Sequence, residues 1–102
     1  MKYRIIMADK ANDQLYDIIN YITEDSSVDI AINYFNMIEK AIMGLEDFSY
    51  KGSTPHYSIL KKQGYCVLIM EKHLVFYKVN EEEKVVIIYA IVDGRREYKN
   101  LI

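Results

Sequence analysis

The residues best suited to bind or transfer charged groups lie near the C-terminus, where Arg95 and Arg96 are followed by Tyr98. A guanidinium group stays protonated and holds a phosphate or a carboxylate through two parallel hydrogen bonds, so this pair can bind an anionic group. The tyrosine can donate a proton or offer a ring on which a nucleobase stacks. Alternatively, the segment is a solvated tail whose Tyr98 packs back onto the sheet. The residue types alone leave both interpretations open.

A second basic pair, Lys61 and Lys62, lies beside Gly64 at a predicted strand end or turn. From this position the two ammonium groups can face the same groove as the C-terminal arginines and bind a substrate or a partner there. Solvation alone explains the two lysines equally well. His73 follows Lys72 at a predicted strand start and can titrate near neutrality, but a single histidine in such a place is usually structural.

The sequence offers no metal centre, cofactor site or disulfide. Cys66 is the only cysteine, and no close spacing links it to His56 or His73, so a zinc site is not expected. Because Cys66 lies inside an apolar run, we interpret it as a small buried side chain rather than as a nucleophile. The N-terminal segment has no apolar stretch long enough for a signal peptide or a membrane helix. We therefore expect a cytoplasmic protein without membrane contact, which also suits the lone cysteine.

One domain over residues 1–102 is expected, because a chain of 102 residues buries a single core. The net charge of −2 conceals an asymmetry between the two halves of the chain. Residues 1–50 carry four Lys or Arg against nine Asp or Glu, whereas residues 51–102 carry nine against six. Only the C-terminal half can therefore offer a polyanion a locally positive surface. The overall acidity argues against broad, non-specific binding of nucleic acid.

The first half of the chain predicts a short strand followed by two amphipathic helices. Residues 2–7 are rich in strand formers, and apolar residues at spacings of three and four predict a helix over about 9–24. A second helix should begin near residue 28, with Ser26 as its N-cap and the acidic Asp29 placed favourably for the helix dipole. Its expected core positions are Ala31, Tyr34, Phe35, Ile38, Ala41, Ile42 and Leu45. A short loop between the helices predicts a packed hairpin.

The second half predicts strands from Tyr57 to Val92, with a break at Gly64. The expected extended segments are 58–60, 65–70, 74–79 and 85–92. The connections between the last three are too short for crossovers, so these strands should form an antiparallel meander. Both faces of the last strand are apolar. It is therefore expected to be central, and either covered on both sides or exposing an apolar groove to a partner.

Together these elements predict an α+β fold, with a helical hairpin packed on one face of a curved, mostly antiparallel sheet. The order is one strand, two helices, three or four strands and a basic C-terminal tail. The core between hairpin and sheet should bury Ile18, Ile22, Phe35, Ile38, Leu45, Phe76 and Ile87 together. A fold of this kind does not by itself identify a function.

Several residues of the second half follow one another in a pattern shared with a family of small toxins. They are Leu60, Gly64, Tyr65, Leu74, Val75, Phe76, Tyr77, Val79, Val85, Ile87, Gly94, Arg95, Arg96, Glu97, Tyr98 and Leu101. From about Tyr3 to Leu101 the chain thus resembles the RelE/ParE family, the toxins of bacterial type II toxin–antitoxin systems. The resemblance implies a RelE-like fold, growth inhibition or plasmid stabilisation, and neutralisation by a cognate antitoxin. It also implies a toxin–antitoxin hetero-oligomer or a homodimer.

Two branches of this family imply different targets. RelE-like members are similar to metal-free endoribonucleases that cut mRNA on the ribosome, where Arg95 and Arg96 would stabilise the phosphorane charge and Tyr98 would donate a proton or stack a base. ParE-like members are similar to poisons of DNA gyrase and have no catalytic site. Cys66 stands where the family commonly has Arg, and Asp93 where many members have His, so these departures and the acidic charge favour gyrase. A third alternative is a degenerate domain that binds an antitoxin-like partner without harm to the cell.

Overall fold

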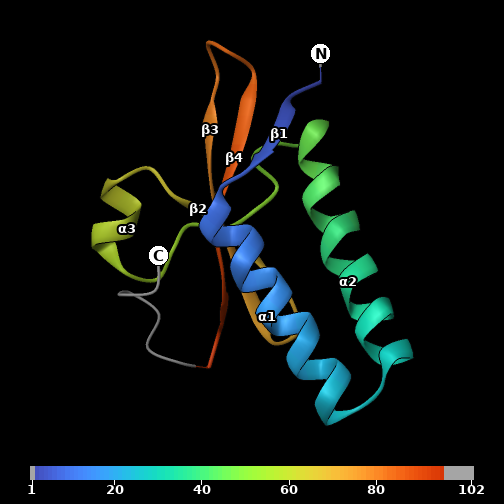
Figure 1. Ribbon diagram of the computed structural model, residues 1–102. Helices are drawn as coiled ribbons and strands as arrows, with labels where there is room; N and C mark the ends of the chain where they lie inside the picture. The colour runs from blue at the N-terminus through green and yellow to red at the C-terminus, as the bar shows by residue number, and fades with distance from the viewer. Residues whose placement is uncertain (1, 96–102) are drawn as a thin grey trace.

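The computed structural model describes residues 2–95 and shows the expected α+β architecture, a helical hairpin packed on an open sheet (Figure 1). The elements in chain order are β1 (Arg4–Met7), α1 (Asp9–Asp25), α2 (Val28–Met43), the 3-10 helix η1 (Gly44–Glu46), α3 (Ser58–Lys62), β2 (Cys66–Ile69), β3 (His73–Asn80) and β4 (Val85–Asp93). The candidate site residues Arg96 and Tyr98 lie outside the described residues. Within residues 2–95, no helix has the length and apolar character needed to cross a membrane.

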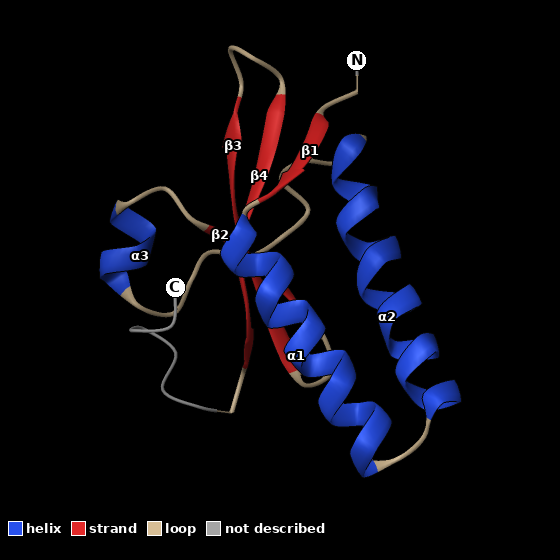
Figure 2. Ribbon diagram, in the orientation of Figure 1, coloured by secondary structure: helices blue, strands red, loops and turns tan. Residues whose placement is uncertain are grey.

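The four strands form one sheet in the order β1-β4-β3-β2, which makes β4 a central strand as expected. The last three strands pair as the expected antiparallel meander, whereas β1 pairs parallel to β4 with Arg4 opposite Val85. The register between β3 and β4 shifts after Phe76, where Tyr89 is the extra, unpaired residue of β4. Such a bulge increases the local twist of a strand pair, which agrees with the twisted sheet in Figure 2.

The helical hairpin lies on one side of the sheet, with α1 packed against β4 (Figure 2). The second helix begins after Ser27, whose extended backbone lets its hydroxyl accept a hydrogen bond from the Ile30 amide at 3.1 Å. The prediction that Ser26 is the N-cap is wrong, because the Ser26 amide still donates to the carbonyl of Ile22 and ends α1. The start of α2 at Val28 agrees with the sequence.

The main apolar cluster lies between the hairpin and the sheet. It contains Ile38 and Leu45 as expected, and Ile18 packs against it as a partly buried neighbour. Three other expected members are only partly buried and belong to neither cluster of buried residues: Ile22, Phe35 and Ile87. The helical spacing therefore predicted more buried residues on the inner faces of the two helices than the structure shows.

A second apolar cluster lies on the opposite face of the sheet, where the sequence did not predict one. The Phe76 ring is fully buried there with Leu60 and Val92, so its predicted place under the hairpin is wrong. The physical reason is strand alternation: Val75 faces the hairpin, and its neighbour must face the other way. The sequence showed that both residues are apolar, but it did not show which of them points toward the hairpin.

The short helix α3 covers this second face. A strand over 58–60 was predicted and is wrong, because the amides of Leu60 and Lys61 both donate to the carbonyl of Tyr57 and close helical turns. Three residues are too few to display a period of 3.6 rather than 2. With α3 on one side and the hairpin on the other, β4 is covered on both faces, which decides between the two alternatives that its sequence allowed (Figure 2).

Candidate functional site

The end of β4 carries the basic segment that the sequence identified, and an acid neutralises the first arginine there. Two guanidinium nitrogens of Arg95 lie 3.2 and 3.0 Å from the two carboxylate oxygens of Asp93, and the Arg95 amide donates to the same carboxylate at 2.8 Å. These hydrogen bonds lower the pKa of Asp93 from 3.8 to about 2. In the described structure the charge of Arg95 is thus already satisfied within the chain.

A histidine and a tyrosine lie beside this ion pair. His73 is directly opposite Asp93 in the β3–β4 register, and its Nδ1 shares a hydrogen bond of 2.7 Å with the hydroxyl of Tyr34 in α2. Burial lowers the pKa of His73, while the charge of Asp93 partly opposes that shift. The contact ties the hairpin to the sheet. It agrees with a structural role for this histidine, and only the strand register could reveal its partners.

The lysine pair lies in the short helix α3. Lys61 and Lys62 are exposed in the last turn of α3, on the face of the sheet that holds Leu60. Asp93 and Arg95 instead act on His73, which contacts Tyr34 of α2 on the hairpin face. The common groove predicted for the two basic groups stays a prediction, because Arg96 lies outside the described residues.

Cys66 begins β2 and is partly buried rather than reactive. Burial raises the pKa of its thiol, which disfavours the thiolate that a nucleophile or a metal ligand needs. Within residues 2–95, no three His, Cys, Asp or Glu side chains lie close enough together to hold a metal ion. The structure thus places a protonated, uncharged thiol at the start of β2.

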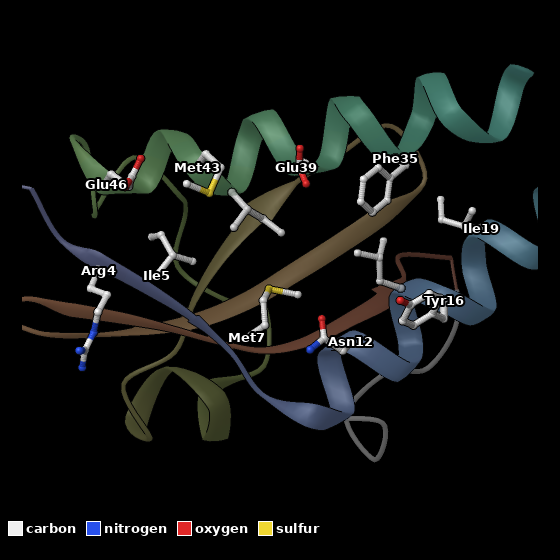
Figure 3. Close-up of a pocket in the computed structure, with 12 residues that line it drawn as sticks. Arg4, Ile5, Met7, Asn12, Tyr16, Ile19, Phe35, Glu39, Met43 and Glu46 are labelled. Carbon is white, nitrogen blue, oxygen red and sulfur yellow. The ribbon is translucent and has the colours of Figure 1, made fainter.

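A groove of about 560 Å³ lies elsewhere, between the two hairpin helices and β1 (Figure 3). Its lining residues are Arg4, Ile5, Met7, Asn12, Leu15, Tyr16, Ile19, Phe35, Glu39, Ile42, Met43 and Glu46. In Figure 3 the Phe35 ring and Ile19 approach one another from the two helices, and Met7 rises from the floor. Most of the lining is apolar, and its size is in the range of ligand-binding clefts.

Sequence reasoning missed this groove, because helical spacing assigned Phe35 to the core without showing how far the helices separate. The two helices diverge toward β1 (Figure 1), so the Phe35 side chain lines an opening instead of packing in the core, while Ile42 reaches both the groove and the core. A signal was nevertheless present: Tyr16 and Met43 lie beside the predicted core stripes but are large and apolar, and they are 70% and 44% exposed.

Comparisons with known proteins now define the family. Residues 5–98 match the family model of the ParE toxin of the type II toxin–antitoxin system parDE, so the chain belongs to the ParE toxin family. A solved structure of the chromosomal ParDE system from P. aeruginosa is similar over 90% of this chain and 96% of that chain, with a TM-score of 0.74 and 16% identity. No curated protein matches significantly.

A second solved structure extends the likeness to the RelE side of the fold. The toxin–antitoxin complex RelBE2 from Mycobacterium tuberculosis is similar over 91% of this chain and 99% of that chain, with a TM-score of 0.62 and 14% identity. At such low identities the two structures show the shared fold alone. They confirm the RelE/ParE-like architecture that the sequence predicted.

Proposed function

We propose that this chain is a cytoplasmic toxin that blocks growth by poisoning DNA gyrase and is neutralised by a cognate antitoxin. The family match supports the toxin, and the similar structures come from toxin–antitoxin systems. The observation that favours gyrase is the pairing of Arg95 with Asp93, since this carboxylate competes with a phosphorane for the arginine. A partly buried thiol at Cys66, where the family commonly has a cation, supports the same choice.

An RNA-cleaving toxin is the second candidate, because the C-terminal residues Arg95, Arg96 and Tyr98 also resemble the RelE branch. In this case Arg96 would stabilise the charge of the transition state and Tyr98 would stack a base or donate a proton. Arg95 would first have to leave Asp93. The remaining alternative is a degenerate domain that binds an antitoxin without harming the cell. Such a domain would cause neither DNA breakage by gyrase nor mRNA cleavage.

The antitoxin is proposed to meet the C-terminal arginines with acidic side chains, within a toxin–antitoxin hetero-oligomer. An incoming carboxylate would compete with Asp93 for Arg95, while Arg96 adds a second positive charge in the sequence. Lys61 and Lys62 are candidates for contacts with the target on the α3 face, because both are exposed there. Charge reversal at both arginines should weaken antitoxin binding and make it less dependent on salt.

The decisive experiment offers the purified protein both targets in parallel. We expect double-strand breaks when gyrase acts on a plasmid in its presence, and intact mRNA on translating ribosomes. If mRNA were cleaved, Arg96→Ala should reduce cleavage on the order of a hundredfold or more without changing folding. Lys40→Ala, an exposed change on α2, is the control. Ribosome-dependent cleavage that Arg96→Ala abolishes would overturn gyrase as the target.

A further inference from the structure

The ion pair at the end of β4 joins an exposed group to a covered one. The Arg95 side chain is 73% exposed and can reach a partner, whereas the Asp93 side chain is only 23% exposed. A carboxylate that is mostly covered depends on groups of its own chain to satisfy its charge. If an anionic group of a partner took Arg95, the Asp93 carboxylate would lose its main side-chain partner and need another cation.

His73 lies where such a second cation is needed. It is directly opposite Asp93 in the β3–β4 register, and opposed residues of an antiparallel pair have Cβ atoms about 4.5–5.5 Å apart. Each of the two lies two positions from a buried residue of the main cluster, Val75 or Ile91, so both side chains extend on the hairpin face. A protonated His73 ring would therefore lie beside the carboxylate.

The groups around His73 disfavour its protonation while Arg95 stays in place. Burial lowers the pKa of this histidine, the Asp93 carboxylate acts in the opposite direction, and the positive charges of Arg95 and Lys72 lower the pKa further. Departure of Arg95 would remove one repulsive charge and leave the attractive charge of Asp93 unmatched. Both changes favour the protonated ring.

The other groups described around this cluster allow the change. From α2, the Tyr34 hydroxyl lies 2.7 Å from Nδ1 of His73, and it can donate to a neutral ring or accept from a protonated one. Glu71, in the turn before β3, is a charged neighbour of Tyr34, and Tyr21 of α1 is a neighbour of Arg95. The contact between hairpin and sheet is therefore compatible with either protonation state of the ring.

We propose that His73 is a proton-dependent replacement for Arg95 as the cationic partner of Asp93. When a carboxylate of a partner takes Arg95, a proton from solvent binds to His73, and the imidazolium satisfies Asp93. Because linked equilibria are reciprocal, acidification from about pH 8 to about pH 6 then strengthens binding of the acidic group. This inference rests on the proposed contact between the C-terminal arginines and acidic side chains, and it adds the regulation of that contact.

Removal of the Arg95 charge tests the exchange without any partner. The full-length protein is titrated between about pH 5 and 9, and NMR follows the ring signals of its two histidines, which His56→Gln assigns. Arg95→Gln should raise the pKa of His73, because the Asp93 carboxylate is then free to attract the proton. Arg95→Lys keeps the charge and Lys62→Gln removes an exposed charge from α3, so neither should move the His73 titration. An unchanged His73 titration in Arg95→Gln would overturn the inference.

Asp93→Asn shows whether this effect depends on the carboxylate. In the Asp93→Asn protein, Arg95→Gln should change the titration of His73 less than it does in the wild type. The attractive charge is gone in that variant, so only the direct repulsion by Arg95 remains to be removed. An equal change in both proteins would show that Arg95 acts on His73 directly, which would overturn the replacement at Asp93.

A hexaglutamate peptide is the probe that stands for the acidic group of the partner. We expect its dissociation constant at about pH 6 to be at least about threefold lower than at about pH 8 in the wild type and in His56→Gln. In His73→Gln the same change of pH should alter it by less than about 1.5-fold. An unchanged pH dependence in His73→Gln would keep the proposed contact but overturn its regulation by His73. A peptide that does not bind would overturn the exchange itself.

Two charge removals locate the peptide. Arg95→Gln should weaken its binding at about pH 6 by about threefold or more, and Lys62→Gln by less than about 1.5-fold. Equal losses would show that the peptide binds by overall charge and would overturn the exchange at Arg95. These assays contain neither antitoxin, gyrase nor RNA. Failure here leaves the toxin assignment and its target intact, and failure to poison gyrase leaves the exchange intact.

Discussion

The hairpin half and the strand half of this molecule treat their charges differently. In the hairpin half Glu39 and Glu46 line an open, mostly apolar groove and form no ion pair within residues 2–95. In the strand half two cations contact partners inside the chain: Arg95 is held by Asp93, and the Lys78 ammonium lies 4.5 Å from the Tyr65 ring centroid. The basic sequence motif therefore begins with a charge that already has a partner, whereas the groove carboxylates have none among the described residues.

The difference teaches that a basic motif does not by itself locate a binding surface. A charge that has a partner must lose it before it can bind another group, whereas an unpaired carboxylate beside exposed apolar surface already favours a cationic, apolar partner. The two apolar clusters allow the same comparison between halves. One is shared between the hairpin and the sheet, and the other is closed by the single residue Leu60 of α3.

The largest effect should come from Phe76→Ala, which tests whether the α3 face is a true core. The ring is fully buried with Leu60 and Val92, so its loss leaves a cavity and should lower the free energy of unfolding by about 3–5 kcal/mol. Phe35→Ala should cost well below that amount, because the Phe35 ring is only partly buried and lines the groove. Urea denaturation measures both values.

The ratio of the losses in unfolding free energy for these two substitutions tests whether the α3 face is a closed core and the groove is open. Equal losses would mean that the groove is closed in solution and that Phe35 belongs to the core. A small loss at Phe76 would mean that α3 does not hold the second face together.

Gly52→Ala should have the next largest effect, because this glycine joins the loop before α3 to the sheet. The Gly52 amide donates to the buried hydroxyl of Tyr77 at 3.1 Å, and burial raises the pKa of that hydroxyl to about 12. An added Cβ would lie 2.5 Å from the carbonyl oxygen of Val67 and 2.7 Å from the tyrosine oxygen. Since backbone would have to move, we expect a loss of about 1–3 kcal/mol in unfolding free energy.

Gly44→Ala is the matched control for that substitution. A Cβ at Gly44 would meet only the end of the flexible Lys51 side chain, which can turn away into solvent. Its thermal melting temperature should therefore stay close to that of the wild type. If both substitutions proved equally harmless, the loop would not be clamped to the sheet as the structure shows.

The smallest effect is the pH dependence of folding stability, to which His73 and Asp93 contribute in different pH ranges. Burial lowers the pKa of His73 below its ordinary 6.5, so the unfolded chain binds more protons and stability should fall as the pH drops below about 6.5. The Arg95 hydrogen bonds lower the pKa of Asp93 to about 2, so its contribution should be lost between pH 3.8 and about 2. Urea midpoints across this range measure both phases.

Two substitutions assign these phases. His73→Gln should flatten the slope between pH 5 and 7, whereas His56→Gln, at an exposed position in the loop before α3, should not. Asp93→Asn should remove the phase at lower pH and release Arg95, which offers a further way to ask whether a free arginine restores RNA cleavage. An unchanged slope in His73→Gln would exclude this histidine as the source of the first phase.

Much of the fold was predictable because local signals and packing agree. Apolar spacing of three and four located α1 and α2, and the short turns required an antiparallel meander. Errors arose where the local signal was weak: 58–60 is too short to show a period, and Ser26 and Ser27 are equally good caps until the backbone angles are known. The site residues Lys61, Lys62, Arg95, Arg96 and Tyr98 stay candidates, two of them outside the described residues.

The sequence alone determined the order of elements, the charge asymmetry and the family pattern, because each is written in residue types and spacings along one chain. Only the tertiary structure decided which face Phe76 takes, that His73 meets Tyr34 and Asp93, and that the helices diverge to leave a groove. These features depend on strand register and on the angle between helices. Both are set by packing between residues distant in the chain, so no local pattern of side chains specifies them.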